Sequence, residues 1–338
     1  MTERGEGATA MLAAQGLTRE RLDAAYRAVR AVMPPTPLVE STYLTKRLGR
    51  PVWLKLESVT PIRAFKVRGA IAKVAEMQAA GGGGALVTAS AGNHGLAVAF
   101  AGRRVGRPVT VFVPGHANPT KVAAIEALGA AVVAGGHTFG DLWQKASAFM
   151  RETGAEWVHP FDDPAVIAGQ ASVGREIAEA LPDVATVVVP IGGGGLASGI
   201  GAALALHAPA ARLVGVQMEG ADSMVRSLEA GRVVTLDKVQ TVADGLAPGT
   251  ASERTLSLVG AFADTVLRLA DDTLFVAMRV LLERERVLAE VSGAAGVAAL
   301  LAATVAGDGP IVVVVTGGNV AMRDLARAME TPLPEDPA

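Results

Sequence analysis

Residues 187–207 read VVVPIGGGGLASGIGAALALH, and this stretch indicates how the chain folds. A short β-branched run of this kind is typical of a buried parallel strand. Four consecutive glycines follow it: Gly192, Gly193, Gly194 and Gly195. They let backbone amides approach an anion without interference from Cβ atoms, and the dipole of the next helix favours negative charge there. The turn predicts a phosphate site; a tight strand-to-helix connection is the plainer alternative.

The same order of strand, glycine-rich turn and helix recurs along the chain. Further short apolar runs lie at residues 85–89, 109–114, 130–135, 212–217 and 311–315. This alternation predicts an α/β protein with parallel sheets flanked by helices. Ligands of such sheets collect beyond the carboxyl ends of the strands. We therefore expect functional residues in the turns that follow the strands.

Composition and charge exclude several classes of site. The 338 residues include 50% hydrophobic side chains and no cysteine, so disulfides, thiolate catalysis and cysteine zinc sites are excluded. The balance of 31 basic and 33 acidic side chains lacks the footprint of a nucleic-acid or anionic-membrane partner. The apolar runs are too short to span a bilayer, and the N-terminus lacks a signal-peptide pattern. We expect a cytoplasmic protein.

One lysine in residues 57–70, ESVTPIRAFKVRGA, stands at an unusual position. Pro61 breaks any preceding helix and an apolar-periodic segment begins just after it, so Lys66 is expected in the first turn of a helix. That turn is already partially positive and is a poor place for a cation. A snorkelling surface lysine is the plainer interpretation. The alternative is a lysine whose charge is suppressed, so that its amine acts as nucleophile and base.

Two other turns carry polar residues where ligands are expected. The motif SAGNHG begins at Ser90 and forms a second anion cradle at a helix start, with Ser90 as N-cap. Its Asn93 is either a ligand contact or a left-handed turn residue, and His94 either contacts a ligand or packs against the helix. The motif TGGN follows the last strong strand, and its Thr316 either caps the next helix or contacts a ligand.

A different cofactor class is also compatible with the glycine turn. Gly192, Gly194 and Ala197 fit the pattern G-x-G-x-x-A, and Glu219 follows the next strand. This spacing is a passable dinucleotide fingerprint, which keeps a nicotinamide-dependent oxidoreductase as an alternative. A non-catalytic binder of small molecules is a third possibility, which Lys66 weakens.

The motifs AFKVRGA, SAGNHG, GGGG and TGGN occur in this order and at these distances in fold-type II pyridoxal-phosphate enzymes. The chain most resembles their serine/threonine dehydratase and serine racemase group, and the segment HPFDDPAVIAGQ at residues 159–170 adds to the resemblance. It covers nearly the whole chain. It implies two domains with the architecture of tryptophan synthase β: a large cofactor-binding domain of residues 1–72 and 161–338, and a small inserted domain of residues 73–160.

The resemblance also assigns roles to residues. It implies that Lys66 forms the Schiff base with pyridoxal 5′-phosphate, that Gly192 to Gly195 hold the cofactor phosphate, and that Asn93 hydrogen-bonds the ring oxygen. Phe65 would pack near the ring. Thr316 would face the pyridine nitrogen, and a neutral hydroxyl there favours β-elimination over transamination. The substrate carboxylate would lie in the loop made by Ser90, Ala91, Gly92, Asn93 and His94.

Several positions depart from the family pattern. The racemases of the group carry a serine as second acid/base where this chain has Ala91, so racemisation is not expected. The metal-binding members use a glutamate, a carbonyl and an aspartate; here Glu219 and Ser223 match, but Val225 replaces the aspartate. Phe161 predicts an apolar pocket wall. No metal motif is predicted from the histidines either, because no pairing at i and i+4 occurs among His116, His137, His159 and His207.

The expected activity is deamination of L-threonine or L-serine to a 2-oxo acid and ammonia, with Lys66 as the base that takes the Cα proton. A 3-hydroxyaspartate dehydratase, another lyase of this fold type or a serine racemase remains an alternative. The resemblance further implies a homodimer that acts on a small amino-acid substrate.

Overall fold

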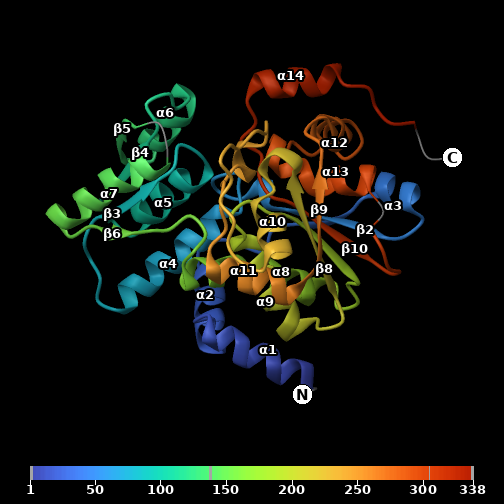
Figure 1. The fold of residues 1–338 in the computed structure, drawn as a ribbon, viewed down its shortest axis with the longest axis horizontal. Helices are drawn as coiled ribbons and strands as arrows, with labels where there is room; N and C mark the ends of the chain where they lie inside the picture. The colour runs from blue at the N-terminus through green and yellow to red at the C-terminus, as the bar shows by residue number, and fades with distance from the viewer. Residues whose placement is uncertain (1–2, 137–138, 304, 336–338) are drawn as a thin grey trace.

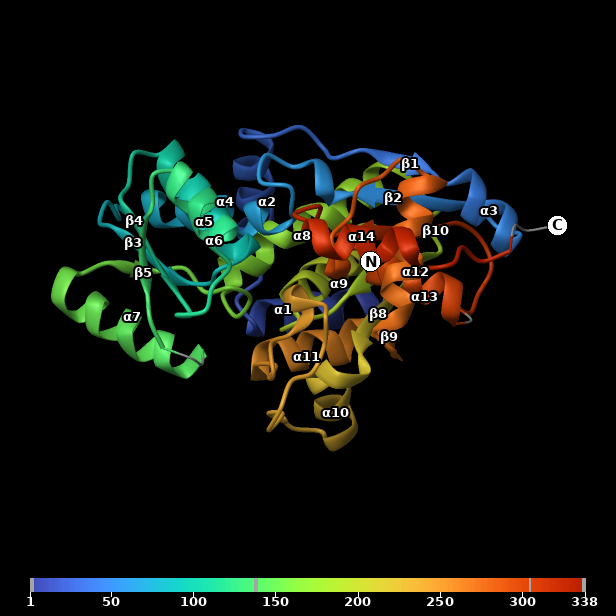
Figure 2. The ribbon, with the colours of Figure 1, turned by 90° about the horizontal axis from the view of Figure 1, so that it is seen from above.

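The computed structural model describes residues 3–136, 139–303 and 305–335 and contains two β-sheets with helices on their faces (Figure 1). The view in Figure 2 separates them, with the smaller sheet and helices α5, α6 and α7 forming one lobe and the larger sheet with most other helices forming the second. This confirms the predicted α/β class with two mostly parallel, helix-flanked sheets. No helix among the described residues is long and apolar enough to cross a bilayer.

The larger sheet has six strands, and only its edge strand β1 runs antiparallel. In spatial order these strands are β1 (Leu38–Glu40), β2 (Val52–Leu56), β10 (Ile311–Val315), β7 (Thr186–Pro190), β8 (Arg212–Met218) and β9 (Ala263–Leu269). The smaller sheet is wholly parallel. Its order is β5 (Ala131–Ala134), β4 (Val109–Val113), β3 (Leu86–Ala89) and β6 (Glu156–Trp157). Every strand expected from the sequence is confirmed to within one or two residues.

Helices follow most strands, as the alternation predicts. The α-helices are α1 (Glu3–Ala14), α2 (Arg19–Arg30), α3 (Thr42–Leu48), α4 (Lys66–Ala79), α5 (Asn93–Arg104), α6 (Pro119–Ala127), α7 (Phe139–Thr153), α8 (Pro164–Ala180), α9 (Gly195–His207), α10 (Ser223–Ala230), α11 (Glu253–Phe262), α12 (Asp272–Glu283), α13 (Ala295–Ala302) and α14 (Met322–Glu330). Short 3₁₀ helices are η1 (Glu57–Val59), η2 (Glu219–Ala221), η3 (Asp244–Leu246) and η4 (Val291–Ala294).

Small apolar side chains fill the interior between these layers. Helix α9 packs on one face of the larger sheet and α13 contacts its strands β7, β8, β9 and β10. The cores are dominated by Val, Leu and Ala, which is what a chain with only 4% aromatic residues must use. Close packing of such residues supplies most of the hydrophobic stabilisation of an α/β domain. The smaller sheet lies between α5 and α7.

A short antiparallel contact joins two distant parts of the chain at the edge where functional residues were expected. Ala64 forms an isolated bridge with Gly317, Phe65 N donates to Thr316 O at 3.0 Å, and Gly318 N donates to Arg63 O at 2.8 Å. The segment before α4 is thereby bonded to the end of β10. Helix α4 begins at Lys66, which confirms the expected first-turn position.

All strands of the smaller sheet lie between residues 86 and 157, inside the expected insertion. The expected boundary at residues 72 and 73 falls within α4, which passes from one lobe toward the other and packs against both α5 and α8. The limits of the two domains stay a prediction.

A buried cluster of charges anchors the first turn of α4. The Arg68 guanidinium is fully buried, with Nε 2.7 Å from Glu57 Oε2 and Nη1 2.7 Å from Glu176 Oε1. Lys55, in the middle of β2, lies 2.7 Å from the other Glu176 oxygen and also donates to the carbonyl of Thr36. The charges of two cations and two carboxylates cancel inside the protein, so each partner is needed to satisfy the others.

Glu176→Gln removes one of these charges without changing the shape of the side chain. We expect the free energy of unfolding to fall by about 3–5 kcal/mol, because Lys55 and Arg68 are left buried beside too little negative charge. The control is Glu179→Gln, one turn later on α8, where an exposed carboxylate pairs with Arg175; its loss should cost about 0–1 kcal/mol. Urea denaturation measures both, and equal losses would contradict a special role for the buried cluster.

Candidate active site

The carboxyl ends of three adjacent strands of the larger sheet lead to residues singled out in the sequence. Strand β2 leads through η1 to Lys66, β10 leads to Thr316, and β7 leads to the glycine turn. From the smaller sheet, β3 leads to Asn93. Parallel strands place their carboxyl ends at one edge, which is where ligands of α/β proteins bind. The predicted residues thus come from one edge of each sheet.

Lys66 occupies a site that disfavours its charged form. It is the first residue of α4, and its Nζ donates to the carbonyl of Pro160 at 2.7 Å. Nζ lies 5.2 Å from the centre of the Phe65 ring, and no carboxylate among the described residues forms an ion pair with it. Burial lowers the pKa of Lys66 to about 8. The ammonium form still predominates at pH 7, but the fraction of neutral amine, which is the nucleophilic form, is far larger than for an ordinary lysine.

The glycine turn is shaped so that side chains are excluded from it. Gly194 caps α9 with φ of +93°, a left-handed conformation that favours glycine. A Cβ on Gly193 would lie 2.5 Å from the Phe161 ring. The turn opens α9 with unblocked backbone amides, which is the arrangement that binds phosphate at a helix N-terminus.

The segment that follows β6 forms a wall between Lys66 and the glycine turn. Pro160 accepts from Lys66, and the neighbouring Phe161 packs on Gly193. His159 fixes this segment, because its Nδ1 accepts from the backbone N–H of Asp162 at 2.7 Å. Burial lowers the pKa of His159 to about 4, so the imidazole stays neutral and keeps that acceptor. Phe161 places its ring against the glycine turn, and its part in an apolar pocket wall stays a prediction. His159 is structural, as the sequence indicated.

The loop after β3 differs in detail from its sequence interpretation. Ser90 is not the N-cap: α5 begins at Asn93 with Gly92 as cap, and Ser90 Oγ accepts from Gly92 N at 3.2 Å within the loop. The carbonyl of Ser90 lies 2.4 Å from where a Cβ on Gly95 would be, so only glycine permits this bend. Asn93 is helical and not left-handed, because the described residues with positive φ other than glycine are Arg63 and Arg286.

The remaining residues of this loop differ in their surroundings. His94 is buried, and its Nε2 donates to the carbonyl of Val158 at 2.9 Å. Burial lowers the pKa of His94 to about 3, with a smaller contribution from Lys66, so the ring is neutral. Ala91 is half-buried and packs on the core under the smaller sheet. It carries no group that exchanges a proton.

The amide of Asn93 contacts two residues that the sequence analysis did not identify. Its Nδ2 donates to Glu290 Oε1 at 2.6 Å, and its Oδ1 accepts from Asn319 Nδ2 at 2.7 Å. Asn319 ends the quoted TGGN motif and could have been chosen with Thr316. Glu290 has no such signal, because it belongs to no recognisable motif and contacts Asn93 only in the folded structure. Thr316 itself is buried, and it cannot cap the next helix, which begins at Met322.

The two metal candidates, Glu219 and the carbonyl of Ser223, lie just after β8. Glu219 lies in η2, and the carbonyl of Ser223 accepts from the hydroxyl of Ser227 at 2.6 Å. The buried Asp222 nearby is paired with Arg226 at 2.8 Å. The part of the chain that the structure describes holds no cluster of three potential metal-ligating side chains. His137 lies outside the described residues.

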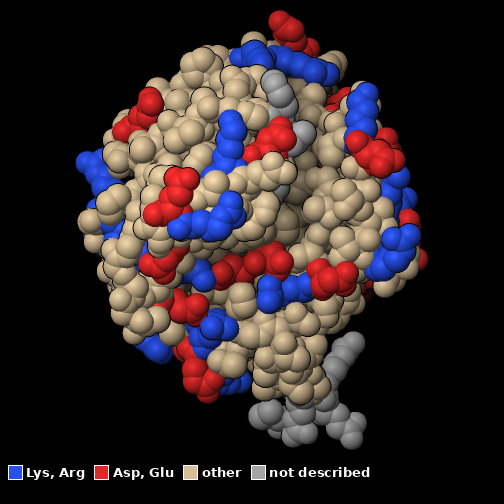
Figure 3. Space-filling model, turned by 60° about the vertical axis from the view of Figure 1, so that its left-hand side comes forward, with Lys and Arg blue, Asp and Glu red and all other residues tan. Residues whose placement is uncertain are grey.

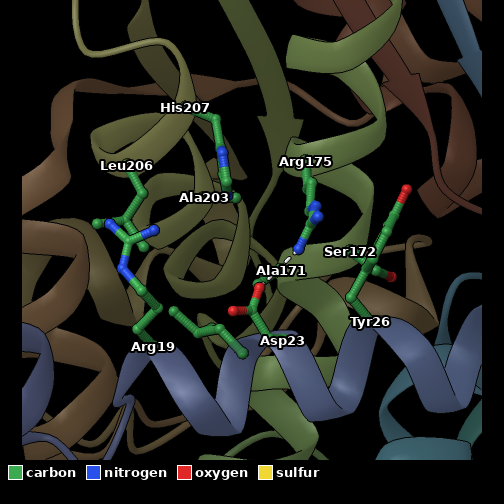
Figure 4. Close-up of a pocket in the computed structure, with 10 residues that line it drawn as sticks. Arg19, Asp23, Tyr26, Ala171, Ser172, Arg175, Ala203, Leu206 and His207 are labelled. Carbon is green, nitrogen blue, oxygen red and sulfur yellow. Dashed lines mark hydrogen bonds and ion pairs between the residues drawn. The ribbon is translucent and has the colours of Figure 1, made fainter.

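A separate crevice lies between α2, α8 and α9, away from the residues above (Figure 4). Arg175 crosses it, with Nη1 2.7 Å from Asp23 and its guanidinium 4.0 Å from the centre of the Tyr26 ring. Its volume is about 20 Å³, room for little more than a water molecule. Arg175 and Asp23 in this crevice already pair with each other. The face shown in Figure 3 likewise carries cations and carboxylates interspersed.

Comparison with known proteins identifies the family. The family described as "Pyridoxal-phosphate dependent enzyme" matches residues 29–317. The chain belongs to this family. An L-threonine ammonia-lyase of Thermotoga maritima is 38% identical over 304 residues, which cover 90% of this chain and 76% of the relative.

Solved structures give the same result for the fold. The structure of maize serine racemase matches with a TM-score of 0.87 and 30% identity, covering 92% of this chain and 96% of the racemase. Threonine deaminase isoform 2 of Solanum lycopersicum matches with a TM-score of 0.86 and 32% identity, covering 92% of this chain and 87% of the deaminase. Membership of the pyridoxal-phosphate family decides against the nicotinamide alternative that the glycine spacing had left open.

The residues of the site fit the cofactor of the family. A desolvated primary amine, Lys66, suits an aldehyde, and the left-handed Gly194 turn at the start of α9 suits a phosphate. Pyridoxal phosphate is the cofactor of this enzyme family, and this chain supplies both groups from the carboxyl edge of one sheet, Lys66 after β2 and the glycine turn after β7.

Gly194→Ala tests whether the glycine turn binds the cofactor phosphate. The new Cβ would lie 2.7 Å from Met224 Cε at a φ that disfavours alanine, so the free energy of unfolding should fall by about 1–3 kcal/mol. Pyridoxal-phosphate affinity should fall as well. The control Gly231→Ala has φ of +63° but no atom within 4 Å of the new Cβ, so it should lose stability alone. Fluorescence titration of the apoprotein measures affinity, and an unchanged affinity for Gly194→Ala would exclude the turn as the phosphate site.

Proposed function

We propose that this protein is a pyridoxal-phosphate-dependent ammonia-lyase that converts L-threonine or L-serine to a 2-oxo acid and ammonia. The observation that carries the proposal is Lys66, held at the start of α4 with a pKa lowered to about 8. The names of the relatives support the reaction class, because both an ammonia-lyase and a deaminase match most of this chain.

Each residue of the proposed site has a separate task. The amides of Gly192 to Gly195 bind the cofactor phosphate. Phe65 packs near the ring, and Thr316 faces the ring nitrogen. Bound there, pyridoxal phosphate supplies an electron-withdrawing ring that stabilises negative charge at the Cα atom of an amino acid. A neutral threonine hydroxyl leaves the ring nitrogen largely unprotonated, which moderates that effect and favours elimination over transamination.

The chain's own groups then handle the substrate. The backbone amides and hydroxyl of the loop that begins at Ser90 bind the substrate carboxylate at the start of α5, where the helix dipole favours an anion. The freed amine of Lys66 accepts the Cα proton, because desolvation keeps it partly neutral. Phe161 contributes an apolar wall that excludes water from the glycine turn. Asn93 donates to the ring oxygen of the cofactor.

Serine racemase is the second candidate, because the maize enzyme matches this fold with a TM-score of 0.87. Racemisation needs a proton acceptor on one face of Cα and a donor on the other. Lys66 serves one face, and Ala91 offers no exchangeable proton for the other. The lyase is therefore the better-supported function. We further propose that the protein is a cytoplasmic homodimer, on the basis of the family resemblance.

Lys66→Ala should abolish elimination while the protein stays folded. General-base catalysis alone contributes roughly 10²–10⁴-fold, and loss of the covalent attachment adds to it. The control is Lys73→Ala on the same helix, where the lysine pairs with Asp163 at 2.7 Å and has no proposed chemical role. A coupled assay for 2-oxobutanoate or pyruvate measures both variants. Turnover by Lys66→Ala close to that of the unmodified enzyme would exclude Lys66 as the base.

The unmodified enzyme should form pyruvate from L-serine with almost no D-serine. Ala91→Ser would place a hydroxyl in a loop that already contains Ser90, and any gain of D-serine in this variant would place position 91 beside Cα. Chiral chromatography of the reaction products resolves the two outcomes. If the unmodified enzyme forms D-serine as fast as pyruvate, the racemase is the correct assignment.

A further inference from the structure

Glu290 is a buried carboxylate that the proposed chemistry leaves without a task. It lies just before η4 with 8% of its surface exposed, and its backbone N–H donates to the carbonyl of Gly317 at 3.0 Å. Its Oε1 accepts from Asn93 Nδ2 at 2.6 Å. No cation among the described residues forms an ion pair with it. A buried carboxylate with a neutral hydrogen-bond partner alone needs an explanation.

The hydrogen bonds around Asn93 fix which way its amide points. Asn319 Nδ2 donates to the carbonyl of Ile62 at 2.9 Å and to Asn93 Oδ1 at 2.7 Å. The carbonyl of Ile62 can only accept a hydrogen bond, so the group of Asn319 that faces it must be the NH₂ group. The same NH₂ group faces Asn93, which must therefore present its oxygen as acceptor. At the far end, an ionised Glu290 can only accept, so it requires the Asn93 nitrogen. One N–H of Asn93 is used there and the second is left for a ligand.

Glu290 and Asn319, which bond the two ends of the Asn93 amide and are called the clamp below, belong to the opposite lobe from Asn93. Asn93 begins α5 of the smaller sheet, whereas Glu290 and Asn319 follow α12 and β10 of the larger-sheet lobe. The clamp therefore ties the two lobes together at the proposed cofactor ring.

We propose that Glu290 is a positioning residue: its ionised carboxylate helps to hold the Asn93 amide in the orientation that leaves a donor for the cofactor, and protonation of Glu290 leaves Asn319 alone to set that orientation. This inference rests on the proposed function, in which Asn93 donates to the ring oxygen. A protonated Glu290 carries its own O–H, so it can bond to either end of the amide and no longer selects one orientation.

The surroundings place this change within the physiological range. Burial raises the pKa of Glu290 to about 7; Asp244 adds to the rise, while the bond from Asn93 and the charge of Lys121 oppose it. Asp244 on η3 and Lys121 on α6 are the charged groups that face Glu290, and they pair with each other. Above pH 7 Glu290 is mostly ionised, and Glu290 and Asn319 together orient the Asn93 amide; below pH 7 Glu290 is mostly protonated, and Asn319 alone orients it.

The experiment compares pyridoxal-phosphate dissociation constants of the unmodified apoprotein and Glu290→Gln between pH 6 and pH 8. The quantity compared is the ratio of the dissociation constant of the variant to that of the unmodified protein at each pH. Ionisation of the ligand and of Lys66 affects both proteins alike and cancels in this ratio. At pH 8 the variant should bind roughly tenfold more weakly, because a charge-assisted bond that selects one orientation is replaced by a neutral one. At pH 6 the ratio should approach one, because Glu290 of the unmodified protein is then protonated.

Two controls separate positioning from general structural support. Asn319→Ala removes the other hydrogen bond to the Asn93 amide, so Glu290 alone orients the amide in this variant; its loss of affinity should be larger at pH 6, where Glu290 is protonated, than at pH 8. Glu285→Gln neutralises another carboxylate whose pKa burial raises, but which accepts from Ser41 outside the site; its ratio should stay near one. Thermal unfolding of each apoprotein verifies that the variants are folded at both pH values.

The outcomes distinguish this inference from the proposed function. A ratio for Glu290→Gln that falls from roughly ten to one between pH 8 and pH 6 supports positioning by charge. A ratio that is constant with pH shows a merely structural carboxylate, and tighter binding by the variant at pH 8 shows charge repulsion; either result overturns the inference. Absence of pyridoxal-phosphate binding by the unmodified protein overturns the proposed function as well. Binding without elimination overturns the reaction and leaves the clamp standing.

Discussion

The antiparallel contact between residues 63–65 and 316–318 is the constraint on which the site depends. It fixes the backbone just before Lys66 to the end of β10 through bonds in both directions. Thr316, Asn319 and Lys66 therefore share one rigid edge, although they lie far apart in the sequence. The contact also sets the direction in which α4 leaves the sheet, and α4 in turn packs against α5 and α8. Both lobes are positioned from this junction.

Lys66 and Arg68 are only two residues apart, but their electrostatic surroundings are opposite. Arg68 is surrounded by carboxylates that balance its charge completely within the cluster. Lys66 has a carbonyl as its hydrogen-bond partner and no balancing carboxylate among the described residues. The first arrangement supports the helix, and the second makes ammonium unfavourable at its N-terminus. A helix that is firmly anchored one turn later can hold a destabilised lysine at its first residue.

The sequence predicted those features that depend on local chemistry. Pro61 marks the start of α4, and four glycines mark the turn before α9, so Lys66 and Gly192 to Gly195 could be placed without a structure. Strand β2 was not predicted, because Lys55 interrupts its apolar run and pairs with Glu176, 121 residues away. Glu290 was missed for the same reason, since its partner Asn93 is 197 residues distant. The prediction of Ser90 as N-cap of α5 was wrong, because α5 begins three residues later at Asn93 and the Ser90 hydroxyl accepts from the Gly92 N–H within the loop.

The position of β10 has a consequence for how the protein is made. This strand is the last of the larger sheet in sequence order but lies between β2 and β7 in the middle of that sheet. Until it has left the ribosome, β2 and β7 each present an unpaired edge, and the residues before Lys66 lack their partners. Such long-range pairing is slow and exposes edges that can aggregate. The nascent chain cannot assemble its lysine pocket before residues 311–318 have emerged, so cofactor capture must follow their synthesis and cannot guide the folding of the earlier strands.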